Sequence, residues 1–329
     1  MNRLSRNEGS VLLIAVVAVA TAAALAVAAG FAVRGKARAA AGRARRRDGL
    51  RHAEEAAVRA LFERVAADTN AFDSLDEPWA REPWEVRDEG WILRVSGDGW
   101  RPGVGETTGL RDAESLLPLN TADEKLLQTA GVRLAGLERA AAVAAARSIA
   151  AYRIERRAAI SNRLERAGEE VAPATNAPPF RAMAELACVE GLPEGAGIAL
   201  EPWFTAHGSG KLNPNTAPDA LLECALVAAG GGDIAAALRL RDRIRSFRAA
   251  GGVFTAADAP SVARALGGIP PDETLLLARA CEGFEVVSTV YEGVAEALSA
   301  ADYQAGRPPF RLRFAWDKTA ARFLWTIEE

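Results

Sequence analysis

The chain has few residues that suit metal, redox or histidine-dependent chemistry. Its 329 residues include three cysteines and two histidines. Cys188, Cys224 and Cys281 are far apart and odd in number, which excludes a disulfide framework and a Cys-x-x-Cys motif. The sequence is compatible with a single disulfide and with buried free thiols. His52 and His207 have no cysteine or histidine partner at ligand spacing, so neither a metal site nor a histidine-based triad is predicted.

Sequence motifs of enzymes are also lacking. There is no motif with paired catalytic carboxylates, no nucleophile elbow, no P-loop and no dinucleotide fingerprint. Gly230 to Gly232 is interpreted as a loop, not as a phosphate cradle. The composition is 50% hydrophobic and 25% charged, which is typical of a globular protein. We therefore predict a protein that is not an enzyme and has no cofactor.

A long uncharged run stands near the N-terminus. Residues 11–33 form a 23-residue stretch of mostly Ala, Val and Leu, about 35 Å long as a helix and enough to cross a bilayer. A cleaved signal sequence has a shorter apolar core, so a retained membrane helix over 10–33 is favoured. Residues 34–67 lack proline and place Leu50, Ala57, Leu61 and Val65 at helical spacing, which predicts a stem helix.

Positive charge is unevenly placed around this run. Two basic residues precede it, and seven follow it: Arg34, Lys36, Arg38, Arg43, Arg45, Arg46 and Arg47. By the positive-inside rule, the side after the run would be cytoplasmic. The alternative is a basic helix that continues outward and contacts lipid headgroups on the other side of the membrane.

Sequence patterns typical of strands lie on both sides of a central region that is predicted to be helical. Trp84 and Val86, then residues 91–95, alternate around the turn Asp88-Glu89-Gly90, which predicts a hairpin. Residues 284–290, 310–316 and 323–327 alternate as well and are expected to complete the same sheet. We predict an α+β fold: a first part over 68–109, an α-helical insertion over 110–282 and C-terminal strands over 283–329.

Two similar Asn-Thr-Ala segments mark expected helix starts inside the insertion. In the segment Lys211 to Glu223, Thr216 is the expected N-cap, Pro218 lies in the first turn and Asp219 closes a capping box. Asn120 and Thr121 begin a weaker copy 95 residues earlier. The pair predicts two related helical units, although an ordinary capping box gives the same pattern.

Residues 210–218 read Gly-Lys-Leu-Asn213-x-Asn215-Thr-Ala-Pro. This pattern resembles the signature of the type II secretion system protein K family, the large minor pseudopilins. The ordered segments 176–186, 191–193, 200–205 and 210–212 continue that resemblance, as does the acidic stretch ending in Glu77-Pro78-Trp79. A similar signature opens the helix-hairpin-helix of competence DNA-binding proteins. The resemblance implies a pilin-like fold whose helical insertion is of the helix-hairpin-helix or SAM-like type.

The resemblance also implies processing and partners. Residues 1–9 resemble a prepilin leader, cut by prepilin peptidase between Gly9 and Ser10, although Ser10 departs from the usual Phe. Ile14 would be the fifth mature residue, where protein K typically lacks the Glu of other pilin-like subunits. The implied protein has a single pass through the bacterial inner membrane and a periplasmic C-terminal domain. It joins other minor pseudopilins at the pseudopilus tip, to start assembly for export of folded proteins.

Relatives of this kind can hold calcium in the helical insertion, through an Asp-rich stretch after the first Asn-Thr-Ala unit. Here the corresponding neighbourhood is Ile149 to Arg153, and only Glu169 and Glu170 remain as ligands. We predict that the family-type calcium site is absent.

The alternative function is that of a membrane-tethered helix-hairpin-helix DNA-binding protein of competence type. Residues 49–329 hold 31 basic and 41 acidic residues, a net charge of −10 that repels phosphate. The glycine turn over 230–232 ends in Asp233. Five arginines circle the helix that follows: Arg239, Arg241, Arg243, Arg245 and Arg248. No nucleic-acid partner is therefore expected.

Overall fold

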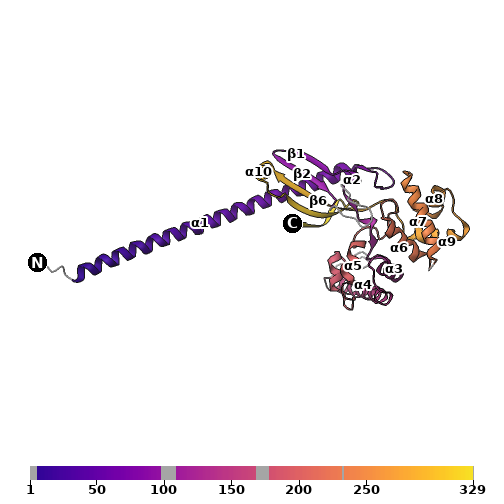
Figure 1. Ribbon diagram of the computed structural model, residues 1–329, viewed down its shortest axis with the longest axis horizontal. Helices are drawn as coiled ribbons and strands as arrows, with labels where there is room; N and C mark the ends of the chain where they lie inside the picture. Colours follow the sequence, from indigo (N-terminus) through magenta and orange to yellow (C-terminus); the bar gives the residue numbers. More distant parts are fainter. Residues whose placement is uncertain (1–5, 98–108, 168–177, 232, 329) are drawn as a thin grey trace. The chain divides into compact units, whose positions relative to one another are not determined.

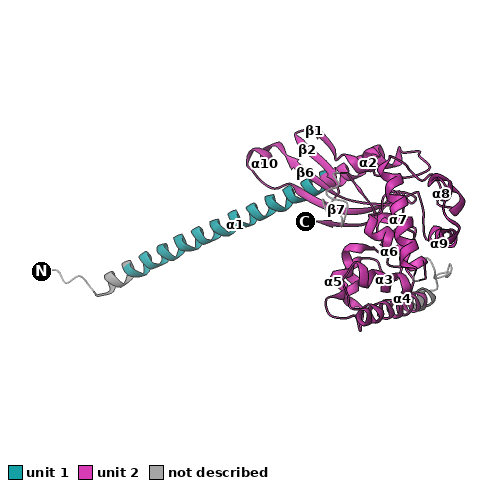
Figure 2. Cartoon of the chain, turned by 45° about the vertical axis from the view of Figure 1, so that its right-hand side comes forward, with its two compact units in different colours: residues 1–52 teal, residues 53–329 magenta. Residues whose placement is uncertain are grey.

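The computed structural model describes residues 6–97, 109–167, 178–231 and 233–328. The chain divides into two compact units, residues 1–52 and 53–329 (Figure 2). Helix α1, Arg6–Leu61, makes up the described part of the first unit, and its residues from Ala53 onward belong to the second unit (Figure 1). It contains no proline, and its length and composition suffice to cross a membrane. The expected membrane and stem segments are thus one continuous helix.

The end of α1 packs through small side chains. Ala53, Ala56 and Ala60 are buried, three and four residues apart, and so share one face of the helix. The helix then passes into a π-helical turn, Phe62–Ala66. This face belongs to a hydrophobic cluster with residues of the sheet, including Trp84, Leu93, Tyr291 and Phe314. Alanine at these positions lets the helix backbone approach the sheet closely.

The sheet is antiparallel with strand order β1-β2-β6-β7-β8, and a short strand β3 also pairs with β6. Its strands are β1 Trp84–Asp88, β2 Trp91–Ser96, β3 Arg111–Asp112, β6 Val290–Ser299, β7 Phe310–Asp317 and β8 Arg322–Glu328. The predicted hairpin is confirmed, and its turn places Glu89 at φ 45° and Gly90 at φ 83°. The last strands do complete the sheet that begins at Trp84, so the predicted α+β class is confirmed.

The strand predicted over 284–290 is wrong in position. Residues 284–289 form no strand apart from an isolated bridge between Phe284 and Leu212, and β6 begins at Val290. This strand lies between β2 and β7 and is buried on both faces for much of its length, so its hydrophobic alternation is weak. A Cβ on Gly293 would lie 2.7 Å from the Leu110 side chain and 2.9 Å from the Ser96 carbonyl oxygen, which explains a glycine in a central strand.

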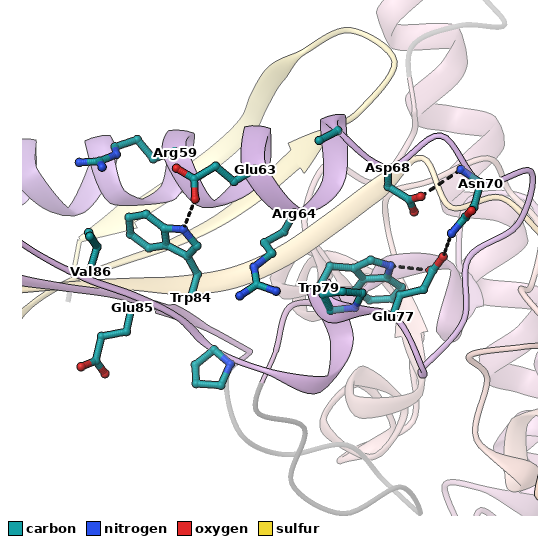
Figure 3. Close-up of a pocket in the computed structure, with 13 residues that line it drawn as sticks. Arg59, Glu63, Arg64, Asp68, Asn70, Glu77, Trp79, Trp84, Glu85 and Val86 are labelled. Atoms are coloured by element: carbon teal, nitrogen blue, oxygen red, sulfur yellow. Dashed lines mark hydrogen bonds between the residues drawn. The ribbon is translucent and has the colours of Figure 1, made fainter.

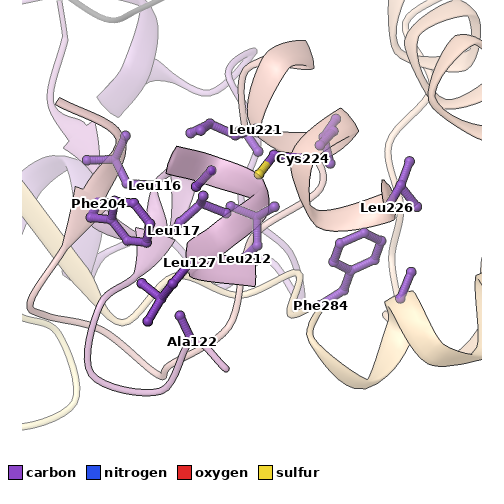
Figure 4. Packing of buried hydrophobic residues seen from close by; sticks show 14 of the residues in the cluster. Leu116, Leu117, Ala122, Leu127, Phe204, Leu212, Leu221, Cys224, Leu226 and Phe284 are labelled. Atoms are coloured by element: carbon purple, nitrogen blue, oxygen red, sulfur yellow. The ribbon is translucent and has the colours of Figure 1, made fainter. Parts of the chain in front are cut away.

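Helices dominate the insertion. They are α3 Glu124–Arg133, α4 Arg139–Ala167, α5 Ala196–Leu200, α6 Asp219–Ala229, α7 Ile234–Ala249, α8 Ala259–Ala265 and α9 Pro271–Glu282. Short helices α2, Pro78–Arg81, and α10, Ala300–Gln304, flank sheet strands, and β4, Leu117–Pro118, pairs in parallel with β5, Phe204–Thr205. Figure 4 shows the apolar core of the insertion, where Leu117, Leu212, Cys224 and Phe284 converge from different elements.

The two predicted helical units share one backbone plan. Helices α6 and α7 each begin 95 residues after α3 and α4 respectively. The turns inside the two pairs contain Gly136 at φ 65° and Gly231 at φ 67°, again 95 residues apart. Only glycine adopts this left-handed conformation without strain. The observed geometry therefore agrees with the repeat predicted from the Asn-Thr-Ala segments.

Candidate functional site

The Asn213-x-Asn215-Thr216 segment lies buried where the insertion meets the sheet. Asn213 is fully buried, and its Nδ2 donates to the Asp73 carbonyl oxygen at 3.3 Å and to Ser288 Oγ at 3.1 Å. Its Oδ1 accepts from the Asn215 backbone N–H at 2.9 Å. One side chain thus ties the loop after α1, the segment before β6 and the start of the second helical unit together.

Asn215 and Asn120 perform the same task in the two units. Asn215 donates to the Phe254 carbonyl oxygen and accepts from the Phe254 N–H, both at 2.9 Å. Asn120 makes the same pair of bonds with the Phe180 backbone, also at 2.9 Å, and donates to the Ala206 carbonyl oxygen at 2.8 Å. Each asparagine amide therefore satisfies both backbone groups of a buried phenylalanine.

The two threonines are not helix caps, which corrects the sequence prediction. Helix α6 begins after Pro218, with no side-chain cap, and α3 is capped by Asp123, whose carboxylate accepts from the Leu126 N–H. Thr216 instead donates its hydroxyl to Asp112 Oδ2, and Thr121 donates to the Gly210 carbonyl oxygen at 2.8 Å. At both positions the threonine hydroxyl therefore bonds to a residue distant in the chain, and no local capping box forms.

A half-buried arginine completes each unit, 33 residues after its asparagine. Arg153 donates to the carbonyl oxygens of Ala122 and Leu119, and Arg248 donates to that of Ala217. Burial lowers the pKa of both guanidinium groups from their ordinary value. Sequence reasoning placed Arg248 among five arginines that circle one helix and did not single out Arg153. Their common spacing from Asn120 and Asn215 was the signal that could have found them.

Three buried acids surround this segment, and sequence reasoning missed all of them. Asp73 accepts from the Ser288 N–H and the Tyr291 hydroxyl, both at 2.6 Å. Glu114 accepts from the backbone N–H groups of Ser209 and Thr289, at 2.9 and 3.1 Å. Asp112 accepts from the Glu114 N–H at 2.7 Å.

Their environment shifts the acidities of these groups. Burial raises the pKa of Asp73, and burial together with the Asp112 carboxylate raises the pKa of Glu114 to about 8. Burial also raises the pKa of Tyr291 well above its ordinary value. No pattern in the sequence marks isolated acids that become buried through contacts more than 100 residues away. The arrangement holds the sheet and the insertion together.

The Glu77-x-Trp79 pattern also has a structural explanation. Glu77 accepts from Trp79 Nε1 at 2.8 Å, from the Ser74 N–H at 2.9 Å and from Asn70 Nδ2 at 2.7 Å. Figure 3 shows Glu77, Trp79 and Asn70 at one end of an open cavity, which has a volume of about 690 Å³ and lies beside the end of α1 and strand β1. At the other end, Trp84 donates to Glu63 at 2.6 Å. The pattern therefore orders the loop that connects the stem helix to the sheet.

Among the described residues, a cluster of three acidic side chains has a spacing compatible with a bound cation. Carboxylate oxygens of Asp68, Asp73 and Glu77 lie within 4.8 Å of one another. Protein donors already occupy oxygens of Asp73 and Glu77, so hydrogen bonding accounts for their burial. Glu169 and Glu170, the two acids weighed for a family-type calcium site, lie outside the described residues.

The cysteines are free thiols in this structure. Cys188 is exposed, Cys281 is partly buried and Cys224 is buried in the core of the insertion. Burial raises the pKa values of Cys224 and Cys281 to about 12, which makes both thiols poor nucleophiles. His207 is also partly buried and accepts from Trp325 Nε1 at 2.9 Å through Nε2.

The residues expected to govern processing lie on α1. Gly9 and Ser10 belong to its helical backbone, and the leader residues 1–5 are outside the described part of the chain. Ile14 is 66% exposed within an apolar stretch whose side chains are likewise exposed. An apolar surface of this extent suits lipid or other apolar helices.

The arginines of α7 are engaged within the protein. Arg239 pairs with Glu273 at 2.7 Å, Arg243 with the same acid at 3.5 Å, and Arg245 with Asp242 at 3.8 Å. Arg241 pairs with Glu223 and Asp242, and Arg248 lies 3.9 Å from Asp219. Acids of the same domain thus neutralise all five basic groups.

No family model matches the sequence, and no curated protein matches it. The structure is similar to a chain of the solved GspK-GspI-GspJ complex from the type 2 secretion system of enterotoxigenic Escherichia coli. The match covers 89% of this chain and 99% of that chain, with a TM-score of 0.55 and 14% sequence identity. At this identity the likeness shows the fold alone. It shows that, over the 89% of the chain that matches, the described architecture is the fold of a chain in that complex.

Proposed function

We propose that the chain is a minor pseudopilin at the tip of a type II secretion pseudopilus. In this role it helps to start pseudopilus assembly for export of folded proteins. The observation that carries the proposal is the fold shared over 89% of the chain with a member of the GspK-GspI-GspJ complex. That complex supports other minor pseudopilins as partners. The apolar helix α1, the one candidate span among the described residues, supports one pass through the inner membrane, with the sheet and insertion in the periplasm.

The chemistry of the site supports a structural role. The buried acids, amides and hydroxyls are hydrogen-bonded to one another and to backbone groups, an arrangement that fixes elements in place. The intramolecular pairing of the α7 arginines and the net charge of −10 over residues 49–329 weigh against the DNA-binding alternative. We accordingly interpret the two helical units as structural elements, without a nucleic-acid ligand.

Ile14 gives the tip assignment a physical basis. In pilin-like subunits with Glu at the fifth mature position, that acid can pair with the free N-terminal amine of the neighbouring subunit. A tip subunit has no neighbour above it, so a carboxylate at this position would be unpaired. An unpaired acid at membrane depth costs about 2.5–3.5 kcal/mol on insertion scales. An apolar side chain avoids this cost.

The assignment is tested by Ile14→Glu in a secretion assay, in cells whose own copy of the gene is deleted. We expect Ile14→Glu to weaken secretion and tip-complex formation, while the melting temperature of the folded domain stays unchanged. Ile14→Leu is the matched control and should behave as the wild type. If Glu is tolerated as well as Leu, Ile14 is one lipid-facing residue among many and the tip assignment loses its physical support.

Leader processing is a separate test of the same proposal. We expect N-terminal analysis of membrane-extracted protein to show Ser10 as the first residue, after cleavage by prepilin peptidase. A protein that begins near residue 33 would instead have lost the apolar helix to ordinary signal cleavage. An uncut protein would show that the leader resemblance is not functional.

A further inference from the structure

Seven cations follow the apolar segment of α1 within 14 residues. We call Arg34, Lys36 and Arg38 the proximal collar, and Arg43, Arg45, Arg46 and Arg47 the distal collar. All seven are exposed on the continuous helix. At about 100° per residue, Arg34, Arg38 and Arg45 share one side of the helix, while Lys36, Arg43 and Arg47 share the opposite side. Such a helix presents positive charge to its surroundings on both sides.

The helix carries no acidic residue beside the proximal collar. There is no Asp or Glu between Glu8 and Asp48. On a helix, opposite charges three or four residues apart would normally offset one another. No Asp or Glu lies within four residues of Arg34, Lys36 or Arg38, so that offset is lacking at the proximal collar, whereas Asp48 lies three residues after Arg45 of the distal collar.

Geometry places the proximal collar at the lipid headgroups. At a rise of about 1.5 Å per residue, Arg38 lies roughly 8 Å beyond Val33, the last apolar residue, and Arg47 roughly 21 Å beyond it. The headgroup region on each side of a bilayer is about 5–7 Å thick. Side chains on a helix lean toward its N-terminus, which here is toward the membrane. The proximal cations therefore reach phosphate depth, and the distal ones stand farther out, where salt screens them more strongly.

We propose that the collar binds anionic phospholipid headgroups, of the phosphatidylglycerol class, in the leaflet from which the stem emerges. Positive charge directly continuous with a membrane span is complementary to such a surface. Residues 49–329 carry a net charge of −10 and are repelled by the same surface. The anionic leaflet thus attracts the stem and repels the globular part. This inference needs only the membrane helix and does not depend on the proposed role in secretion.

The test uses the full chain reconstituted in phosphatidylcholine membranes with trace spin-labelled phosphatidylglycerol or phosphatidylcholine. Electron paramagnetic resonance measures the motionally restricted fraction of each label, and hence the relative association constant at the protein surface. We expect about fivefold selectivity for phosphatidylglycerol, falling toward one as salt is raised. Equal association of the two lipids with the wild type would overturn the proposal.

Three variants separate the contributions of the proximal collar, the distal collar and other exposed cations to the lipid selectivity. Neutralising the proximal collar (Arg34→Gln, Lys36→Gln, Arg38→Gln) should abolish most of the selectivity, and neutralising the distal collar should reduce it less. The control neutralises three exposed cations outside α1 (Arg87→Gln, Lys125→Gln, Arg264→Gln) and should leave selectivity unchanged. Circular dichroism should be the same for all variants.

Two outcomes of these variants would contradict the proposal. Selectivity that survives neutralisation of both collars would place lipid recognition elsewhere in the chain. If the collar variants keep their lipid selectivity but no longer co-purify with a pseudopilin partner, the collar is instead a docking surface for an acidic protein.

Discussion

The two Asn-Thr-Ala units have the same local plan and different surroundings. In both units an asparagine holds the backbone of a phenylalanine, and an arginine 33 residues later binds carbonyl oxygens beside the motif. In the second unit Asn215 is 5% exposed and Thr216 is fully buried, against the acid network below the sheet. In the first unit Asn120 is half-buried and Thr121 is exposed.

The comparison shows which contacts serve the repeat and which serve the whole domain. The asparagine and arginine bonds occur twice, so they belong to the helical unit itself. The bonds of Thr216 to Asp112 and of Asn213 to Asp73 have no counterpart in the first unit among the described residues. They join the second unit to the sheet. We therefore expect equivalent substitutions to have unequal effects.

Substitution of the asparagines should give the largest difference in unfolding free energy between the two units. Asn215→Ala leaves the N–H and C=O of buried Phe254 without partners and should lower the free energy of unfolding by roughly 3–5 kcal/mol. Asn120→Ala should cost about 1–2 kcal/mol, because Asn120 is itself half-buried and water can enter the space that its side chain leaves. Urea unfolding of the detergent-solubilised chain measures both. Equal losses would show that burial does not distinguish the two units.

The threonines sharpen the comparison, because valine replaces threonine with almost no change in shape. Thr216→Val removes a buried donor from Asp112 and should cost about 1.5–3 kcal/mol. Thr121→Val removes an exposed hydrogen bond and should cost less than about 0.5 kcal/mol. If Thr121 were a helix cap, its substitution would instead destabilise α3 by about 1 kcal/mol, and the loss of helix would appear in circular dichroism.

The smallest expected effect is the contribution of His207 to the pH dependence of stability. Burial lowers the pKa of His207, so the folded state holds this group neutral while the unfolded state binds a proton below about pH 6.5. Its contribution to stability is therefore lost as pH falls through 6.5. Protonation of Nε2 also removes the acceptor for Trp325 Nε1.

Tryptophan fluorescence and melting temperature between pH 7.5 and 5.5 report on this change. His207→Gln can accept the same hydrogen bond and cannot titrate, so its melting temperature should vary less over this range. If the variant and the wild type respond equally, other groups account for the acid sensitivity.

Elements with strong local patterns were predictable from the sequence. The hairpin over 84–96 and the strands at 310–317 and 322–328 alternate in hydrophobicity, each with one more exposed face. Strand β6 was misplaced, because a central strand buried on both faces lacks alternation and Gly293 interrupts it. Its position depends on partners on both sides, which no local window contains.

The candidate site shows the same limit. The sequence identified Asn213, Asn215, Thr216 and Asn120 as important, and the structure places them at key contacts, but the role assigned to the threonines was wrong. Capping is a local rule, whereas Thr216 meets an acid 104 residues away in the chain. Asp73, Asp112 and Glu114 were not found, because each becomes a partner only after the sheet and the insertion come together. The processing and tip roles of Gly9, Ser10 and Ile14 stay predictions.

The central proposal, that this chain is a minor pseudopilin, is tested most directly by co-purification of the full chain with the two other minor pseudopilins of its own secretion system. The three proteins are co-expressed with prepilin peptidase, extracted in detergent and isolated through a tag on this chain. We predict a stable complex of all three, retained by Ile14→Leu and weakened by Ile14→Glu. Recovery of this chain alone, with folded and correctly processed partners in the same extract, would contradict the account.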